Sequence, residues 1–335
     1  MAPSLSLAQV LPESLAPAEV WERAELVAHA HAVTLGRSRG LSSAARLLDS
    51  GTRERAWLLY AWWRACVDRV DGDRSGGWRG AHTALPARVT AIGQLTAQAL
   101  AGEATGDPAF DGFGVLAREC GIARALAHDV IAGFALDGGE WVPRGEADLL
   151  RYAYCSAGAV AMMAALAMGV APGDEATLDR ACEAGIAVRL ATIARDLAED
   201  DAAQRCYLPL EWLAEADIPP GEQFKPHART ALLPLVGRVC ALERTYRRSA
   251  RRGARRLPFR SRWAVLALAG VFGAMAGKVE RGGAHAWDRH PVISGAAKWW
   301  YLLGALPSAL VTPRRATEPP PRSRRGLAEG ARETA

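Results

Sequence analysis

Two segments of the chain carry acidic and basic side chains at the spacing of a helix. In the first segment, four residues follow one another at intervals of four, three and four: Tyr60, Arg64, Val67 and Asp71. This spacing places them on one helix face. Asp68 follows Val67 directly and therefore points about 100° further round the helix. The first face thus combines a carboxylate with a guanidinium and a phenol.

The second segment has two carboxylates on its face. The intervals are three, four and four, and the residues are Arg189, Thr192, Asp196 and Asp200. Two carboxylates one turn apart repel each other unless a cation compensates them. The run around Asp196, AVRLATIARDLAED, is otherwise largely apolar. We therefore expect this face to look inward, where a carboxylate needs a cationic or donating partner.

The chemistry that suits such faces is divalent metal and phosphate binding. Hard oxygen ligands without nearby cysteine or histidine favour Mg²⁺ or Mn²⁺, which bridge to substrate phosphates. Arg195 and Arg205 lie close by in the sequence and could grip phosphate through their guanidinium groups. Each acidic cluster alone is more often a solvated helix face. The apolar surroundings of Asp196 favour the metal interpretation.

The elements that must position these faces are helices. Helical patterns cover the chain from about residue 18 to residue 310, and we expect a single all-α domain there. Glycine and proline predict breaks at 71–86, 104–108, 138–145, 171–174, 219–226 and 282–291. Residues 1–17 are expected to be flexible, and residues 311–335, rich in proline and arginine, to be disordered.

The basic charge of the chain gathers in one run. The formal net charge is +5, and residues 244–262 hold nine arginines and no acid. The run is either a solvated helix face or a docking site for anionic lipid headgroups. Nucleic acid is not an expected partner, because no binding motif or aromatic platform accompanies the charge.

Cysteine usage and the N-terminus indicate the compartment. The six cysteines are scattered without CxxC spacing, and the seven histidines show no metal-binding spacing. The first twenty residues lack a basic stretch before an apolar core, so no signal peptide is expected. The apolar run 155–172 is rich in alanine and glycine, which suits a buried central helix better than a membrane span. We expect a cytoplasmic protein, with peripheral contact at the inner face of the membrane as a hypothesis.

Five segments in order resemble the squalene/phytoene synthase family, closest to the bacterial phytoene synthases. The resemblance runs from about residue 38 to residue 298. The segments are SRGLSSAARLLDSGTRERAWLLYAWWR, GFALD, RYAYCSAGAVAMMAALAMGV, RDLAEDDAAQRCYLP and KVERGGAHAWDRHPVISGAAK. The fourth is the most specific, because it resembles the second aspartate-rich motif of the family with its trailing RxYLP.

The resemblance implies an isoprenoid-synthase helical bundle around a central cavity. It implies Mg²⁺-dependent, head-to-head coupling of two geranylgeranyl diphosphates to phytoene through prephytoene diphosphate. Carried over by motif, the expected metal ligands are Asp71, Asp196 and Asp200, with Asp68 as an imperfect substitute in the first motif. The expected substrate-binding residues are Arg37, Ser38, Arg39, Gly40, Tyr60, Arg64, Asp137, Arg189 and Arg195. Tyr207 and Arg205 would support the ionised substrate, and with Asp71, Asp196 and Asp200 they form the expected catalytic set.

Several positions depart from the family pattern on the reactive faces. Val67 stands where the first motif normally begins with aspartate. Arg189 replaces a glutamine, and Thr192 replaces a metal-binding asparagine. Gly40 replaces the second serine of the loop, and Phe272 replaces a tyrosine expected near diphosphate.

Three functional hypotheses follow from these departures. The first is an active phytoene or squalene-type synthase with a modified metal site. The second is a related prenyl-diphosphate enzyme that performs one ionisation or a cyclisation. The third is a non-catalytic paralogue that binds prenyl diphosphate or pairs with an active synthase. An unrelated helical adaptor protein would not reproduce five motifs in order.

Overall fold

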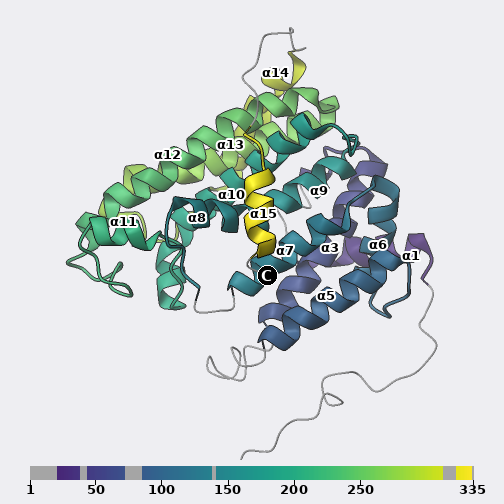
Figure 1. The fold of residues 1–335 in the computed structure, drawn as a ribbon. Helices are drawn as coiled ribbons and strands as arrows, with labels where there is room; N and C mark the ends of the chain where they lie inside the picture. Colours follow the sequence, from purple (N-terminus) through teal and green to yellow (C-terminus); the bar gives the residue numbers. More distant parts are fainter. Residues whose placement is uncertain (1–20, 38–43, 72–84, 138–140, 312–321, 334–335) are drawn as a thin grey trace, which may run out of the picture.

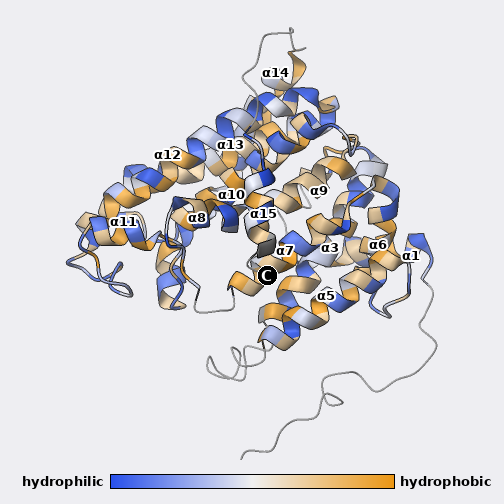
Figure 2. Ribbon diagram, in the orientation of Figure 1, coloured by the Kyte–Doolittle hydropathy of each residue, from blue (hydrophilic) through white to orange (hydrophobic). Residues whose placement is uncertain are grey.

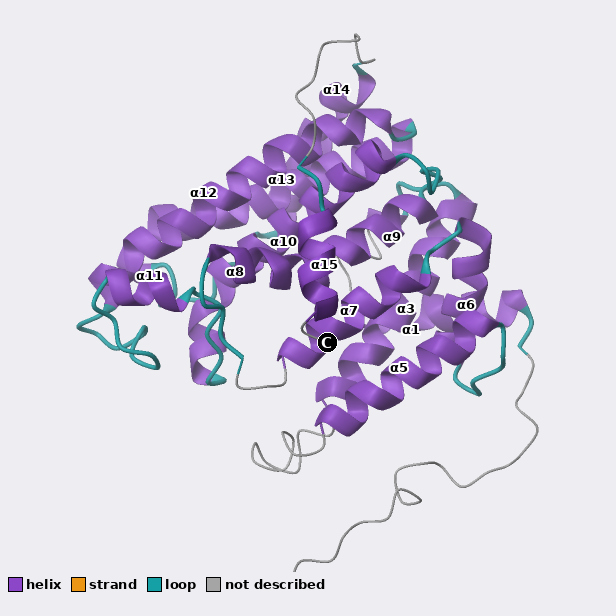
Figure 3. Ribbon diagram, viewed as in Figure 1, coloured by secondary structure: helices purple, strands orange, loops and turns teal. Residues whose placement is uncertain are grey.

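The computed structural model describes residues 21–37, 44–71, 85–137, 141–311 and 322–333. These residues form helices and connecting loops, with no strand in the described ranges (Figure 1, Figure 3). The predicted all-α fold class is confirmed. Three parts of the predictions lie outside the described residues: the N-terminal segment 1–17, the loop residues Ser38, Arg39 and Gly40, and the side chain of Asp71.

The helices of the first half are short to medium in length. They are α1 (Arg23–Arg37), α3 (Ser50–Asp71), α5 (Leu85–Ala101), α6 (Pro108–Cys120), α7 (Arg124–Asp137), α8 (Glu146–Ala153), the π-helix η3 (Tyr154–Gly158) and α9 (Ala159–Ala167). The second half contains α10 (Glu175–Ala202), α11 (Leu210–Glu215), α12 (Arg229–Gly253), η4 (Ala254–Arg256), α13 (Phe259–Gly282), η5 (Gly283–His285), α14 (Gly295–Leu310) and α15 (Arg325–Glu333).

Helix α10, 28 residues long, is the centre of the bundle. It packs against α9, η3, α12 and α13. Helices α1, α3, α5 and α6 form a group on the other side of the molecule, and α9 contacts both α3 and α10 (Figure 1). One hydrophobic core extends from Leu26 in α1 to Ala331 in α15, so both halves share the same interior.

Buried polar groups fix α10 against α12. Arg180 and Glu183 are only 3% and 2% exposed. Nη1 of Arg180 donates to Oγ of Ser249 at 2.9 Å, and the Ser249 hydroxyl donates to Glu183. A Cβ at Gly253 would lie 2.4 Å from the Arg180 side chain, so only glycine lets the helices meet at this depth. This contact sets the distance between the two longest helices of the second half.

A π-helix interrupts the otherwise continuous helix formed by α8 and α9. Residues Tyr154–Gly158 make the wider turn, and such turns re-aim the side chains beside them. Two neighbouring helices approach this turn at glycines. A Cβ at Gly185 in α10 would lie 2.3 Å from the carbonyl oxygen of Ala157, and one at Gly133 in α7 would lie 3.1 Å from Cβ of Cys155. The π-helix is therefore held between α7 and α10.

The glycine and proline breaks agree with the helix boundaries. Helix α7 ends at Asp137 and α8 begins at Glu146, on either side of the break predicted at 138–145. The other predicted breaks also fall between helices or at their ends. The π-helix and the breaks between α6 and α7, α10 and α11, and α12 and α13 were not anticipated.

The expected disorder of the C-terminal tail is wrong for its last described part. Residues Arg325–Glu333 form α15, which packs against α7, α8 and η3. The segment is held by charge pairs as well as by apolar contacts. Arg324 pairs with Glu175 and Asp179, each at 2.5 Å. Composition did not indicate these partners, because they lie about 145 residues earlier in the chain.

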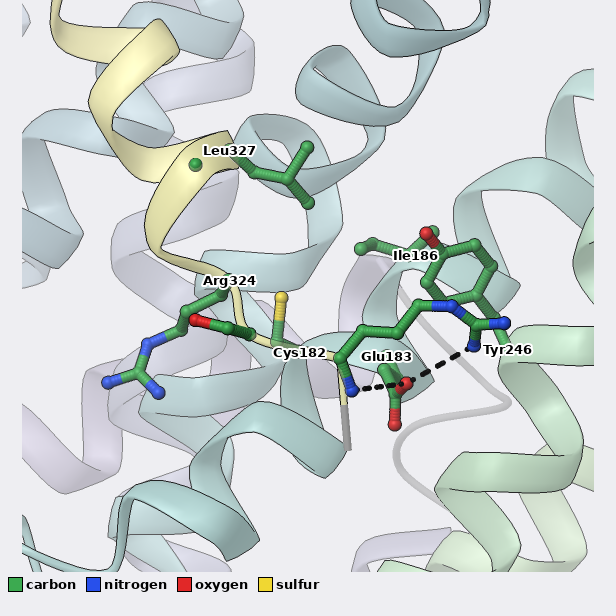
Figure 4. A pocket seen from close by; sticks show the side chains of 9 residues that line it. Cys182, Glu183, Ile186, Tyr246, Arg324 and Leu327 are labelled. Atoms are coloured by element: carbon green, nitrogen blue, oxygen red, sulfur yellow. Dashed lines mark hydrogen bonds and ion pairs between the residues drawn. The ribbon is translucent and has the colours of Figure 1, made fainter. Parts of the chain in front are cut away.

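A pocket of about 240 Å³ lies where this segment meets α10 and α12. Figure 4 shows Glu183 and Tyr246 on its wall beside Leu327. The backbone N–H of Arg322 donates to Glu183 at 3.3 Å, and its guanidinium lies 3.5 Å from the same carboxylate. The pocket is a gap beneath the C-terminal segment, away from the expected aspartate-rich faces.

Two helical stretches of the described residues are long and apolar enough to span a membrane. They are Glu146–Ala167 and Phe259–His285, of which 61% and 28% are buried in the protein. The first matches the expectation of a buried central helix. All six cysteines are free thiols.

We expect Gly185→Ala to lower the free energy of unfolding by about 1–3 kcal/mol, because the new methyl group would collide with the Ala157 carbonyl. Gly93→Ala is the matched control. Gly93 lies inside α5 with no neighbour within 4 Å of its Cβ position, so alanine should stabilise by about 0.5–1 kcal/mol. Urea denaturation measures both. Equal effects of the two variants would contradict the close helix approach.

Candidate active site

Asp137, at the end of α7, is the centre of a polar cluster. Its Oδ1 accepts hydrogen bonds from the hydroxyls of Tyr152, at 2.5 Å, and Tyr207, at 2.7 Å. The two tyrosine rings stack with their centroids 4.8 Å apart. The cluster draws on three separate parts of the chain: α7, the last turn of α8 before the π-helix, and the loop after α10.

Arg189 of α10 completes this cluster. Its Nη2 donates to the Tyr152 hydroxyl and lies 4.0 Å from Asp137. The guanidinium carbon is 4.7 Å from the ring centroid of Tyr152 and 5.0 Å from that of Tyr207. Burial raises the pKa of both phenols, so they act as neutral hydrogen-bond donors. The predicted site residues Asp137, Arg189 and Tyr207 thus lie together.

The end of α10 brings Arg205 and Tyr207 back to this cluster. Gln204 adopts a left-handed conformation with φ of 56°. The N–H of Arg205 donates to the carbonyl of Asp200 at 2.8 Å, and that of Gln204 to the carbonyl of Asp201 at 2.9 Å. These two bonds form a Schellman motif, which ends a helix and reverses the chain. The guanidinium of Arg205 is thereby brought near Tyr207 and Asp137, whose charge raises its pKa.

The carboxyl group of Asp200 lies in surroundings that disfavour its ionised form. Its pKa is raised to about 7, chiefly by burial and also by the nearby carboxylates of Asp196 and Asp137. The guanidinium groups of Arg189 and Arg205 oppose this shift without cancelling it. Asp200 therefore lacks enough positive charge around it when ionised, as expected for a group that meets a cation.

Asp196 lies one turn earlier on α10 and pairs with its neighbour Arg195. Nη2 of Arg195 is 2.5 Å from Oδ2 of Asp196, and its Nη1 is 3.5 Å from the sulfur of Met275 in α13. The expected pairing of an acid and an arginine on this face is present. Arg195 stands between the acidic face and α13.

Sequence reasoning missed two further members of the acidic face. Ligand atoms of Asp196, Glu199 and His290 all lie within 4.8 Å of one another. His290 Nδ1 is 2.6 Å from Glu199 Oε1. The loop that carries His290 is anchored by Trp287, whose indole N–H donates to the carbonyl of Ala194 at 3.0 Å. Tyr152 was missed as well, although the quoted segment RYAYC contains it.

The first motif forms a separate group on α1 and α3. Asp68 pairs with Arg64, one turn earlier, and its other oxygen lies 3.6 Å from Arg37. Tyr60 lies next to Trp63, with ring centroids 6.0 Å apart. Val67 packs at the edge of the hydrophobic core. The first motif thus brings together Arg37, Arg64 and Asp68, with Tyr60 on the same helix as the last two. Helix α9, which contacts both α3 and α10, lies between the two motif helices.

Three of the predicted phosphate-binding arginines carry a spare donor. The Nε atoms of Arg64, Arg189 and Arg205 are buried and have no hydrogen-bond partner within the described ranges. Arg53, outside the predicted set, shares this feature, whereas the Nε of Arg55 lies 3.6 Å from the carboxylate of Glu119. A buried donor without a partner is costly, so these groups suit an anionic ligand that would accept from them.

The acidic face also fits the divalent cation that the motifs imply. The observation that decides this is the under-compensated carboxyl of Asp200, with Asp196 and Glu199 on the same helix. Carboxylate oxygens are the ligands that Mg²⁺ and Mn²⁺ prefer. On α3, Asp68 is already engaged by two arginines.

The fold and the site define a helical isoprenoid synthase. Residues 36–297 match the family model described as squalene/phytoene synthase. The chain belongs to the squalene/phytoene synthase family. The predicted resemblance is confirmed, and the chain is a prenyltransferase of the squalene/phytoene synthase type, from a divalent-metal-dependent family whose enzymes bind prenyl diphosphates.

Relatives of known function cover almost the whole chain. A 15-cis-phytoene synthase from Pantoea ananas is 38% identical over 88% of this chain and 96% of its own length. A phytoene synthase from Pseudescherichia vulneris is 36% identical over 87% of this chain and 96% of its own length.

Solved structures show the same fold at lower identity. A dehydrosqualene synthase with bound ligand superposes with a TM-score of 0.75 at 19% identity, covering 85% of this chain and 97% of that one. A squalene synthase from Alicyclobacillus acidocaldarius gives 0.70 at 18% identity, covering 79% and 97%.

The pKa of Asp200 predicts how one variant responds to pH. In metal-free buffer, Asp200→Asn should gain stability relative to the wild type as pH rises from about 4 to about 7, by about 1–2 kcal/mol. The reason is that the unfolded carboxyl ionises near pH 4, whereas the folded one stays protonated until about pH 7. Wild-type stability therefore falls across this window, and the amide does not titrate.

Urea denaturation with a chelator at about pH 4.5 and about pH 8 measures the difference. Asp217→Asn, at an exposed loop position, is the matched control for the amide substitution itself. Parallel pH profiles of the wild type and Asp200→Asn would show that the carboxyl is already compensated.

Proposed function

We propose that this protein is a phytoene synthase, which joins two geranylgeranyl diphosphates head to head through prephytoene diphosphate. The observation that carries the proposal is the α10 face, where the under-compensated carboxyl of Asp200 stands beside Arg189 and Arg205 with their spare buried N–H donors. Such a face offers a cation site and an anion site side by side. The bacterial phytoene synthases among the relatives support the substrate and the product.

The difficult step is the departure of diphosphate from an allylic carbon. Guanidinium groups at Arg64, Arg189 and Arg205 would stabilise the leaving negative charge through preorganised hydrogen bonds. Asp137 holds Tyr152 and Tyr207 by their hydroxyls, and this fixes both rings and the guanidinium of Arg189 that lies against them. We also propose that Arg37, Tyr60 and Arg195 contact diphosphate.

A divalent metal would be held by Asp196 and Asp200 on α10, with Asp71 and Asp68 as candidates on α3. It would supply Lewis-acid polarisation of the diphosphate oxygens. The protein must also exclude water from the cation that forms. Helix α9 contributes apolar side chains between the two motif helices, among them the fully buried Met162 and Met163.

A second candidate function is a paralogue that binds prenyl diphosphate without turning it over. Two observations favour it. Val67 packs against the core where the family has a metal-binding aspartate, and Arg189 occupies the face of the tyrosine pair. Such a protein would partner an active synthase. In either case we propose a cytoplasmic protein that works at the inner face of the membrane, because prenyl substrates and products are lipid-soluble.

Incubation of the purified protein with geranylgeranyl diphosphate and Mg²⁺ tests the main proposal. We expect phytoene in the lipid extract, with two pyrophosphates released for each phytoene formed. Asp196→Asn should lower the rate roughly a hundredfold or more, because it removes a charge that is needed as diphosphate leaves. Asp217→Asn serves again as the control.

The products decide among the hypotheses. Pyrophosphate with a different hydrocarbon would indicate the enzyme that performs one ionisation or a cyclisation. If neither hydrocarbon nor pyrophosphate is formed, the protein is not a catalyst of this reaction. Tight binding of the substrate in that case would support the non-catalytic paralogue.

Val67→Asp should restore a carboxylate on the first motif face. We expect pyrophosphate release to rise about tenfold at limiting Mg²⁺, because a second acidic side chain joins Asp71 on this face. Val67→Asn has nearly the same shape without the charge and should leave the rate near that of the wild type. An equal rate for the two variants would mean that Arg189 and Thr192 limit the site instead.

A further inference from the structure

Helix α14 has two apolar faces, and among the described residues only one of them is packed. Ala305 and Ala309 are buried against α13, where they form a small core with Ala254, Leu266 and Ala267. The packed face is fixed by two polar contacts to α13. The Trp263 indole N–H donates to the carbonyl of Leu302 at 2.7 Å, and Nη1 of Arg262 donates to the carbonyl of Ala309 at 3.0 Å.

The outer face of α14 is apolar and open. Trp299, Trp300 and Leu303 are 63%, 75% and 54% exposed. Leu310 at the end of the helix is 64% exposed, and Val311 after it is 63% exposed. Residues 299, 303, 307 and 310 are separated by three or four positions, so they share one face opposite the buried alanines. Contiguous exposed apolar patches often mark interaction sites.

Basic side chains border the same surface. Nη1 of Arg262 also donates to the carbonyl of Val311 at 3.3 Å, which places the end of α14 beside the start of α13. That junction carries the arginine run, of which Arg251, Arg252, Arg255 and Arg260 are exposed. Phe259 at the same junction is 40% exposed. Figure 2 shows α14 in hydrophobic colours at the edge of the molecule, next to hydrophilic segments of α12 and α13.

We propose that the outer face of α14 docks on a membrane surface that contains anionic lipid. Tryptophan and leucine side chains would enter the boundary between headgroups and acyl chains, as in amphipathic helices that lie in the plane of a membrane. The arginines of the α12–α13 junction would bind the lipid phosphates. The helix lies on the surface rather than crossing it, because its other face is committed to α13.

The charge distribution decides between a lipid surface and a second copy of the chain. Two copies that met through α14 about a twofold axis would bring two arginine groups toward each other. Three arginines of the run pair with acids elsewhere in the chain: Arg244 with Glu280, Arg247 with Glu243 and Arg256 with Asp174. The stretches 244–262 and 289–317 contain no acidic residue of their own that a second copy could offer to the exposed Arg251 and Arg252. A bilayer with anionic lipid supplies the missing negative charge. The docking face deepens the proposed location at the membrane and rests on it, but it does not depend on the proposed reaction.

Co-sedimentation of the full chain with vesicles tests the proposal. The vesicles are phosphatidylcholine alone or phosphatidylcholine mixed with phosphatidylglycerol. We expect binding to the mixed vesicles that weakens as salt rises, since headgroup attraction is screened. The double variant Trp299→Ser with Trp300→Ser should bind at least about tenfold more weakly, because binding scales with buried apolar area. Leu35→Ser, at a 50% exposed leucine of α1, is its apolar control.

A charge variant separates the two contributions. Arg251→Gln with Arg252→Gln should weaken binding to the mixed vesicles about fivefold per arginine and should flatten the salt dependence. Arg118→Gln with Arg124→Gln removes the same charge from exposed positions of α6 and α7 and should change little. Thermal unfolding checks that each variant is folded.

Fluorescence quenching tests the docking face of the wild type, so the proposal can be checked even if the serine variant does not fold. Lipids brominated in the acyl chain should quench wild-type tryptophan fluorescence, and this quenching should shrink in Trp299→Phe with Trp300→Phe. Unchanged binding of the serine variant, or no binding of the wild type to either vesicle, would overturn the proposal. A wild-type dimer that becomes monomeric in the serine variant, with no vesicle binding, would assign the face to a second copy.

Discussion

The contact between α10 and the π-helix is the constraint on which the site depends. At Gly185 the helix backbone meets the carbonyl of Ala157 at a distance that admits no side chain. One turn further along α10 stands Arg189, and just before the π-helix stands Tyr152. The close approach therefore sets the guanidinium against the phenol. Tyr207 and Asp137 then assemble around this pair from the two flanking chain segments.

Arg189 changes the electrostatics of the whole α10 face. Glutamine at position 189, which the family pattern implies, would be neutral and would leave Asp137 and Asp200 with the positive charge of Arg205 alone of this pair of arginines. The guanidinium instead lies 4.0 Å from Asp137 and opposes the rise in the pKa of Asp200. A permanent charge on the protein would thus do part of what a bound cation would do on this face. By the family pattern, Val67 and Thr192 would take metal-binding groups away from α3 and α10, so the three departures would act in one direction.

Residue spacing was enough to predict the fold class, most helix ends and the second acidic face. Glycine and proline determine local backbone geometry, which is why the break before Glu146 could be placed to the residue. The π-helix could not be predicted, because it arises from packing between α7 and α10. His290 contacts Glu199, 91 residues earlier in the chain, and Arg324 contacts Asp179, 145 residues earlier. Residue spacing within one segment cannot indicate either contact. Composition pointed to disorder in a segment that its distant partners order.

The position of α15 has a consequence for how the chain matures on the ribosome. Its apolar side covers parts of α7, α8 and η3, and Ala328 and Ala331 belong to the main core. Helix α15 is translated after α7, α8 and η3, so those core surfaces stay uncovered until residues 322–333 have been synthesised. The nascent helices must therefore remain soluble while the apolar surface that α15 covers is exposed. A stop codon shortly before position 322 would leave this surface permanently exposed and make the truncated product a substrate for chaperones and proteases.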